Sequence, residues 1–199
     1  MTERAALPLP ADLPPATRAE AERFALEQIR GGFRTLDLVI RDVEEHFDPQ
    51  REPVTWSQAA DLVDRLWEER LAEQAGWPET TDADRLSAAF DALGAGGITA
   101  RADFTCCRNC GHSEIDAEAA DGDHGFVFFH QQDTARVAAG GGLWLSYGPL
   151  RGSGADPVAV GREVVEALTA AGLPVEWDGS AASRIKVALP EWRKRLPRG

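Results

Sequence analysis

The three cysteines and one of the four histidines of this 199-residue chain lie in one short stretch, Phe104 to His112. Within it, Cys107 and Cys110 are separated by two residues, a spacing at which both thiolates can reach one Zn²⁺ ion at about 2.3 Å. A tetrahedral ion needs two more ligands, and we expect His112 or His130 among them. The other candidates are His124, in a mobile acidic loop, and more weakly Asp123 or Asp133. The stretch therefore predicts a zinc knuckle, with zinc as the cofactor.

Cys106 precedes this pair and extends an alternation of apolar and polar residues that begins at Ile98. Because side chains alternate across a strand, this pattern places Cys106 on the buried face, next to the site rather than in it. Two alternatives stay open for the thiols. One is a thiol-dependent enzyme or redox sensor in which Cys107 is the nucleophile, Cys110 resolves it and His130 is the base. The other is three reduced cysteines that only pack, so whether the chain is an enzyme stays open.

A second polar group follows an aromatic strand expected over 125–130. His130, Gln132 and Asp133 stand where that strand gives way to a helix, a position at which α/β folds often form pockets. The same residues suit a polar helix cap. We therefore treat Gln132 and Asp133, with Cys106, as candidate binding residues around the cysteines.

Composition and charge exclude several classes of function. The chain is 43% hydrophobic and 27% charged, and its formal net charge is −12. Residues 1–95 hold 20 acids against 10 bases, which disfavours nucleic acid and favours a basic protein partner for a helical interaction module. No apolar run approaches the roughly 20 residues that span a bilayer, and the N-terminal residues do not resemble a signal peptide. We therefore expect a cytoplasmic protein with reduced thiols and no membrane partner.

The elements that must position these residues change character near residue 96. A proline-rich, disordered lead-in is expected over 1–15 and a helical subdomain over 16–95, with capping boxes at Thr55–Gln58 and Thr81–Asp84. From Ile98 the hydrophobic period shifts from about 3.6 to 2, which indicates strands. The predicted fold class is α+β, a helical half packed on a small α/β sandwich over 96–199. That sandwich has four to five mostly antiparallel strands and two helices, at 131–139 and 157–171.

The combined pattern of Cys106-Cys107-x-x-Cys110-Gly111, Phe128-Phe129-His130-x-Gln132-Asp133-Thr134 and the later Leu145-x-Tyr147-Gly148 resembles an uncharacterised bacterial family, a domain of unknown function. The likeness extends from about Gly32 onward. It implies no activity, but it does imply that the cysteines, His130, Gln132 and Asp133 belong to one unit.

Overall fold

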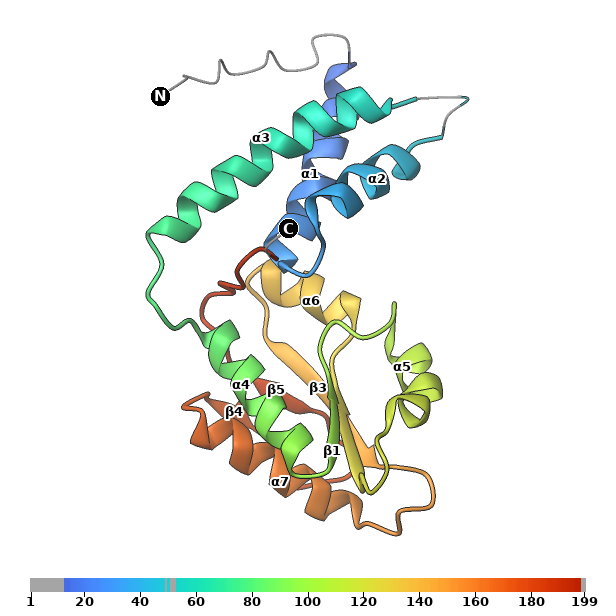
Figure 1. Cartoon of the computed structure of the whole chain (residues 1–199), viewed down its shortest axis with the longest axis vertical. Coiled ribbons are helices and arrows are strands. Elements are labelled where there is room, and N and C mark those ends of the chain that lie inside the picture. The colour runs from blue at the N-terminus through green and yellow to red at the C-terminus, as the bar shows by residue number, and fades with distance from the viewer. Residues whose placement is uncertain (1–12, 49, 51–52, 198–199) are drawn as a thin grey trace. The chain divides into compact units, whose positions relative to one another are not determined.

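The structure is a computed structural model that describes residues 13–48, 50 and 53–197 (Figure 1). The described residues form two compact units, and each is treated by itself. The first contains the residues up to Trp77 together with those from Arg195 on, and the second runs from Pro78 to Lys194. The lead-in expected over 1–15 falls almost entirely outside the described residues. Of its last three residues, Leu13 is buried and Pro15 begins the first helix.

The described residues of the first unit form three helices: α1 (Pro15–Gly31), α2 (Leu36–His46) and α3 (Trp56–Ala75). Gly32 ends α1 with a left-handed backbone (φ 75°), so α1 and α2 are separate helices. The capping box predicted at Thr55 and Gln58 is confirmed at the start of α3. The helices bury one common apolar core, which also receives Leu196, whose N–H donates to Oε1 of Gln74 at 3.0 Å.

The second unit is built on a five-stranded sheet in the order β1-β2-β3-β5-β4. Its strands are β1 (Ile98–Arg101), β2 (Gly125–Phe128), β3 (Leu143–Pro149), β4 (Val175–Glu176) and β5 (Ile185–Val187). Strands β1 and β2 are parallel, and the other neighbouring pairs are antiparallel. The predicted mixture of a helical first half and a mostly antiparallel sheet is therefore confirmed.

Helices α4 (Asp82–Ala95) and α7 (Pro157–Ala170) pack on each other; α4 also packs on the edge strand β1, and α7 packs on β3 and β2. Strand β2 is buried along its whole length because it has a partner on both faces. Phe129, the residue after it, meets Phe90 of α4 at 5.9 Å between ring centroids, whereas Phe128 lies on the side of a short helix, α5 (Arg108–Glu114). The remaining elements are a 3₁₀ turn, Ile115–Glu118, and α6 (Gln131–Ala138).

The boundary between the units differs from the one expected at residues 95 and 96. It falls between Trp77 and Pro78, because α4 buries its apolar face in the unit that contains the sheet. The capping box predicted at Thr81 and Asp84 does start this helix. The sheet unit thus has more helices than the two that the sequence suggested.

Candidate functional site

The loop that carries the cysteines leaves the sheet earlier than the sequence pattern suggested. Strand β1 ends at Arg101, and Asp103 and Thr105 adopt positive φ angles of 53° and 59°, which are uncommon for residues other than glycine. Two backbone hydrogen bonds hold this conformation. The N–H of Phe104 donates to the carbonyl of Phe129 at 2.9 Å, and the N–H of Gln131 donates to the carbonyl of Thr105 at 3.1 Å. The loop is therefore fastened to the connection between β2 and α6.

The alternation that predicted a buried Cys106 stops with this strand, and that prediction is wrong. Cys106 is exposed, while Cys107 and Cys110 are half-buried. The two left-handed residues turn the chain, so the face on which Ile98 is buried does not continue to residue 106. Cys106 consequently turns toward the other two thiols.

The three sulfur atoms form one cluster at the start of α5. Cys107 is the residue that precedes the helix, and its carbonyl accepts the N–H of Gly111 at 3.0 Å. The Sγ of Cys110 lies 3.5 Å from that of Cys106 and 3.6 Å from that of Cys107, and all three sulfurs are within 4.8 Å of one another. Two sulfurs bound to one tetrahedral ion at about 2.3 Å are about 3.8 Å apart, so little movement separates this cluster from a metal-binding geometry. The three cysteines could hold a metal ion.

The thiols affect one another's ionisation. The pKa of Cys107 is lowered, first because the backbone N–H of Cys110 points at its sulfur and also because of the Cys110 thiol. The pKa of Cys110 is raised to about 11, because the Cys106 and Cys107 sulfurs disfavour a further negative charge beside them. A bound cation would remove this repulsion, since it favours the thiolate form of all three.

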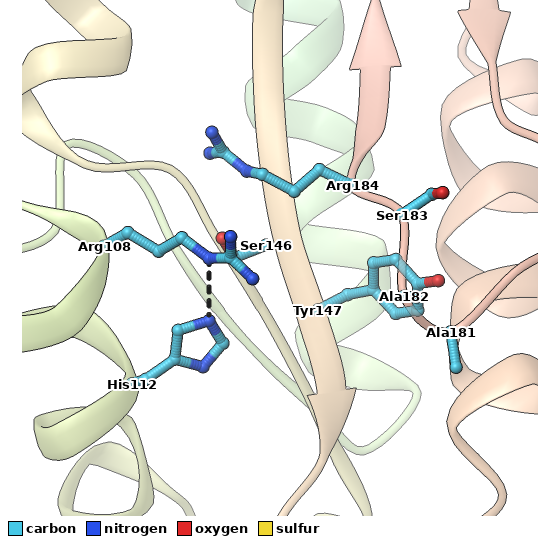
Figure 2. A pocket seen from close by; sticks show the side chains of 8 residues that line it. All are labelled: Arg108, His112, Ser146, Tyr147, Ala181, Ala182, Ser183 and Arg184. Atoms are coloured by element: carbon cyan, nitrogen blue, oxygen red, sulfur yellow. Dashed lines mark hydrogen bonds between the residues drawn. The ribbon is translucent and has the colours of Figure 1, made fainter.

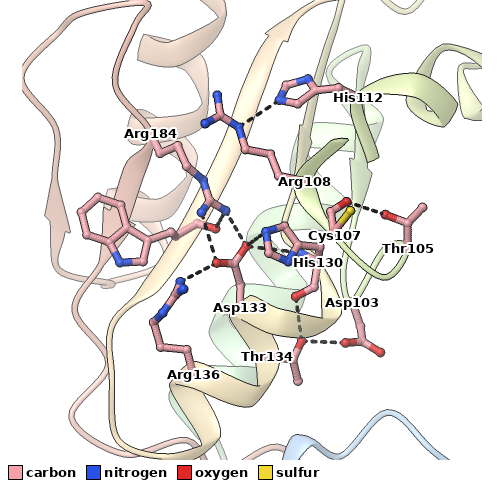
Figure 3. Close-up of polar contacts among 11 residues, drawn as sticks. Asp103, Thr105, Cys107, Arg108, His112, His130, Asp133, Thr134, Arg136 and Arg184 are labelled. Atoms are coloured by element: carbon pink, nitrogen blue, oxygen red, sulfur yellow. Dashed lines mark hydrogen bonds and ion pairs between the residues drawn. The ribbon is translucent and has the colours of Figure 1, made fainter. Parts of the chain in front are cut away.

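His112, expected as a ligand, points away from the cluster. It lies two residues after Cys110 on the same helix, and two residues of an α-helix correspond to a rotation of about 200°. Its ring packs edge-on against Phe126 and Phe128, and its Nε2 lies 3.4 Å from Nε of Arg108 (Figure 3). Burial lowers the pKa of His112, and the charges of Arg108 and Arg184 act in the same direction. His112 is not brought together with the three sulfurs.

His130 is not part of the sulfur cluster either, because it serves a different network (Figure 3). Its Nε2 lies 3.0 Å from Oδ2 of Asp133, a carboxylate with no exposed surface. Asp133 also accepts from Arg136 at 2.8 Å and from Arg184 at 3.1 Å to its Oδ1. Burial lowers the pKa of His130; the carboxylate of Asp133 opposes this effect, and the charges of nearby arginines act in the same direction as burial.

The polar residues that follow β2, His130 and Asp133, therefore cap the N-terminus of α6. The backbone N–H of His130 donates to Asp133, and the hydroxyl of Thr134 donates to Oδ1 of Asp103 at 2.6 Å, which ties α6 to the cysteine loop. Gln132 is exposed and contributes nothing to this network in the described contacts. Sequence reasoning missed Arg184, which lies 51 residues from its partner Asp133 in a stretch that gave no local signal.

Gly111 has a role different from the one its neighbourhood suggested. Beside two cysteines, a glycine is expected to supply a positive φ, but Gly111 is helical. A Cβ built on it would lie 2.4 Å from Cε2 of Phe128, which is fully buried. Gly111 is therefore the point at which α5 closes on the sheet, and this contact sets the position of the cysteines.

The fold and the site define a mixed α/β protein with a three-cysteine cluster beside a five-stranded sheet. The chain belongs to the family described as "Domain of unknown function (DUF6891)", which matches residues 14–196, so the resemblance to an uncharacterised family is confirmed. Neither the curated proteins nor the solved structures gave a match to this chain. Within the described ranges, none of the helices combines the length and apolar character that crossing a bilayer requires.

Proposed function

We propose that this protein binds one Zn²⁺ ion through the thiolates of Cys106, Cys107 and Cys110. The observation that carries the proposal is the spacing of the sulfurs, 3.5 and 3.6 Å from Cys110 to the other two, close to the edge of a zinc–thiolate tetrahedron. Thiolates are soft ligands of the kind that zinc takes in proteins. The knuckle predicted from Cys107 and Cys110 thereby gains Cys106 as its third ligand.

The fourth position of the ion is open in this arrangement. Cys106 is exposed, so water or a ligand atom from another molecule has access to the metal. Three protein ligands with one exchangeable position are characteristic of zinc sites that act on or exchange something, whereas purely structural sites are closed by four protein ligands. The ion would also brace the loop against α5, because Cys106 belongs to the former and Cys110 to the latter.

Metal analysis of the full chain, purified without added zinc, tests the proposal. We expect close to one zinc per chain, and a much weaker affinity in each of C106S, C107S and C110S. H112Q and H130Q are the controls, and both should bind zinc like the unaltered protein because their imidazoles lie outside the cluster. A zinc content near zero per chain in the unaltered protein would refute the proposal. If H112Q lost zinc and C106S kept it, the result would instead support the site predicted from sequence, with Cys107, Cys110 and histidine ligands.

A second candidate, nucleophilic chemistry at Cys107, is favoured by one observation. The backbone N–H groups of Cys110 and Asn109 are directed at the Cys107 sulfur, an arrangement that stabilises a thiolate. Alkylation of zinc-free protein with iodoacetamide, followed residue by residue, tests it. Cys107 should react faster than both other thiols and faster than free cysteine. An unexceptional Cys107 would remove this candidate without affecting the zinc proposal.

A further inference from the structure

A small pocket lies on the other side of α5 from the sulfur cluster, at a place where the sheet is incomplete. Strand β5 starts at Ile185 opposite Leu145, so β3 continues past Leu145 without a partner on that side. The residues before β5 and the free part of β3 leave a hollow of about 20 Å³. Helix α5 closes it with Arg108 and His112 (Figure 2).

Two buried hydrogen-bonding groups in this pocket have no partner among the residues that the structure describes. The Oγ of Ser146 is one, and only 2% of that residue is exposed. The Nε of Arg184 is the other. Buried polar groups in folded proteins are nearly always paired, so two orphans lining one hollow indicate that a ligand atom belongs there.

The charge around the pocket is positive, in contrast to the chain's net charge of −12. Arg108 is exposed, and among the residues that the structure describes its polar contact is the ring of His112 rather than a carboxylate. The terminal nitrogens of Arg184 are turned toward Asp133. Arg136 donates to the same carboxylate, so the single negative charge of Asp133 is shared by two positive arginines. Asp178 does not line the pocket, and its carboxylate accepts a hydrogen bond from the hydroxyl of Ser183, which does, at 2.8 Å.

We infer that this pocket binds an oxyanion of the phosphate class. Its available donors come from three separate elements: Arg108 from α5, Ser146 from β3 and Arg184 from the residue before β5. Donors converging from three directions suit a tetrahedral oxyanion better than a planar carboxylate, and arginine is well matched to phosphate oxygens. A hollow of this size holds one or two oxygens, which leaves the rest of the ligand in the open mouth. The inference does not depend on the metal.

Titration calorimetry with inorganic phosphate tests the site on the full chain, in a Bis-Tris buffer with dithiothreitol so that no competing oxyanion is present. We expect saturable binding that R108A weakens about tenfold, since a charge-assisted contact is lost, and that S146A weakens about fivefold. R151A is the matched control. Arg151 is an arginine of the same unit with 89% of its side chain exposed, and its removal should leave binding unchanged.

Arg108 is the decisive position because no carboxylate of the described part of the chain pairs with it, whereas R184A would leave Asp133 without one of its partners. Acetate should bind more weakly than phosphate at every concentration. Glycerol 3-phosphate, compared with inorganic phosphate, identifies whether the pocket takes a phosphate monoester or the free ion. No saturable binding of either, or equal affinities in R108A and R151A, would overturn the inference.

Discussion

Gly111 is the residue whose replacement most directly tests how the cysteine cluster is positioned. A Cβ at this residue would lie 2.4 Å from Cε2, 2.6 Å from Cζ and 3.1 Å from Cδ2 of Phe128. Ordinary contact begins near 3.4 Å, so either the helix or the ring has to move by about 1 Å. The ring of Phe128 cannot easily yield, because it is fully buried against Phe104 and Phe126. We therefore expect G111A to push α5 away from the sheet.

The magnitude follows from two opposing effects. Alanine is intrinsically better than glycine in a helix by about 0.8–1.0 kcal/mol. Overpacking a filled site costs about 1–3 kcal/mol. The net change expected for G111A is a destabilisation of about 1 kcal/mol, within a range of about 0–2 kcal/mol. G94A is the matched control, since Gly94 is helical and a Cβ there meets nothing within 4 Å, so it should stabilise the same unit by up to about 1 kcal/mol.

Urea denaturation followed by tryptophan fluorescence measures the free energy of unfolding of G111A and of G94A. Hydrogen exchange at β2 reports on the sheet unit alone. G111A should also weaken zinc binding, because Cys107 and Cys110 move with α5, while G94A should not. A G111A variant as stable as G94A, with unchanged exchange at Phe128, would refute the close packing of α5 on the sheet.

Three other substitutions test the remaining contacts of the sheet unit. D133N should lower the free energy of unfolding by about 3 kcal/mol in urea denaturation, because it leaves the partly buried Arg184 without its carboxylate; a loss below about 1 kcal/mol would contradict the network. The folded-state pKa of His130 is lowered, so the unfolded chain binds the proton more readily, and stability should fall as the pH drops below about 6.5. H130Q should weaken that dependence below about pH 6.5 and leave the part due to His112, whose pKa is lowered as well; an unchanged slope would count against it. T81A should cost about 1 kcal/mol through loss of the cap on α4, whereas S87A on the exposed face of the same helix should cost nothing, as thermal denaturation of the pair would reveal.

The features that were predictable from sequence are those that depend on neighbouring residues. The capping boxes at Thr55 and Thr81 and the start of α7 after Asp156 were all predicted, and the structure confirms them. Each of these signals requires only a hydroxyl or carboxylate three residues from the N–H that it accepts. The change from helical to strand periodicity near Ile98 was equally local, and it located the sheet.

The site was less predictable because its geometry depends on contacts between distant segments. Helix α5 has seven residues, includes a glycine and has no apolar periodicity, so the sequence did not indicate it. Its presence turns His112 away from Cys110, and the left-handed residues before it bring Cys106 in. Packing of Gly111 on Phe128 stabilises that arrangement, and such a contact leaves no trace in a local pattern. The membership of α4 in the sheet unit was missed for the same reason.

X-ray absorption spectroscopy of the zinc-loaded full chain can decide whether three thiolates hold the ion, because it counts the atoms bound to the metal. We expect three sulfur neighbours at about 2.3 Å and one nitrogen or oxygen neighbour at about 2.0 Å, with one sulfur fewer in C106S. Two sulfurs and two imidazole nitrogens in the unaltered protein, or a spectrum that C106S leaves unchanged, would contradict it.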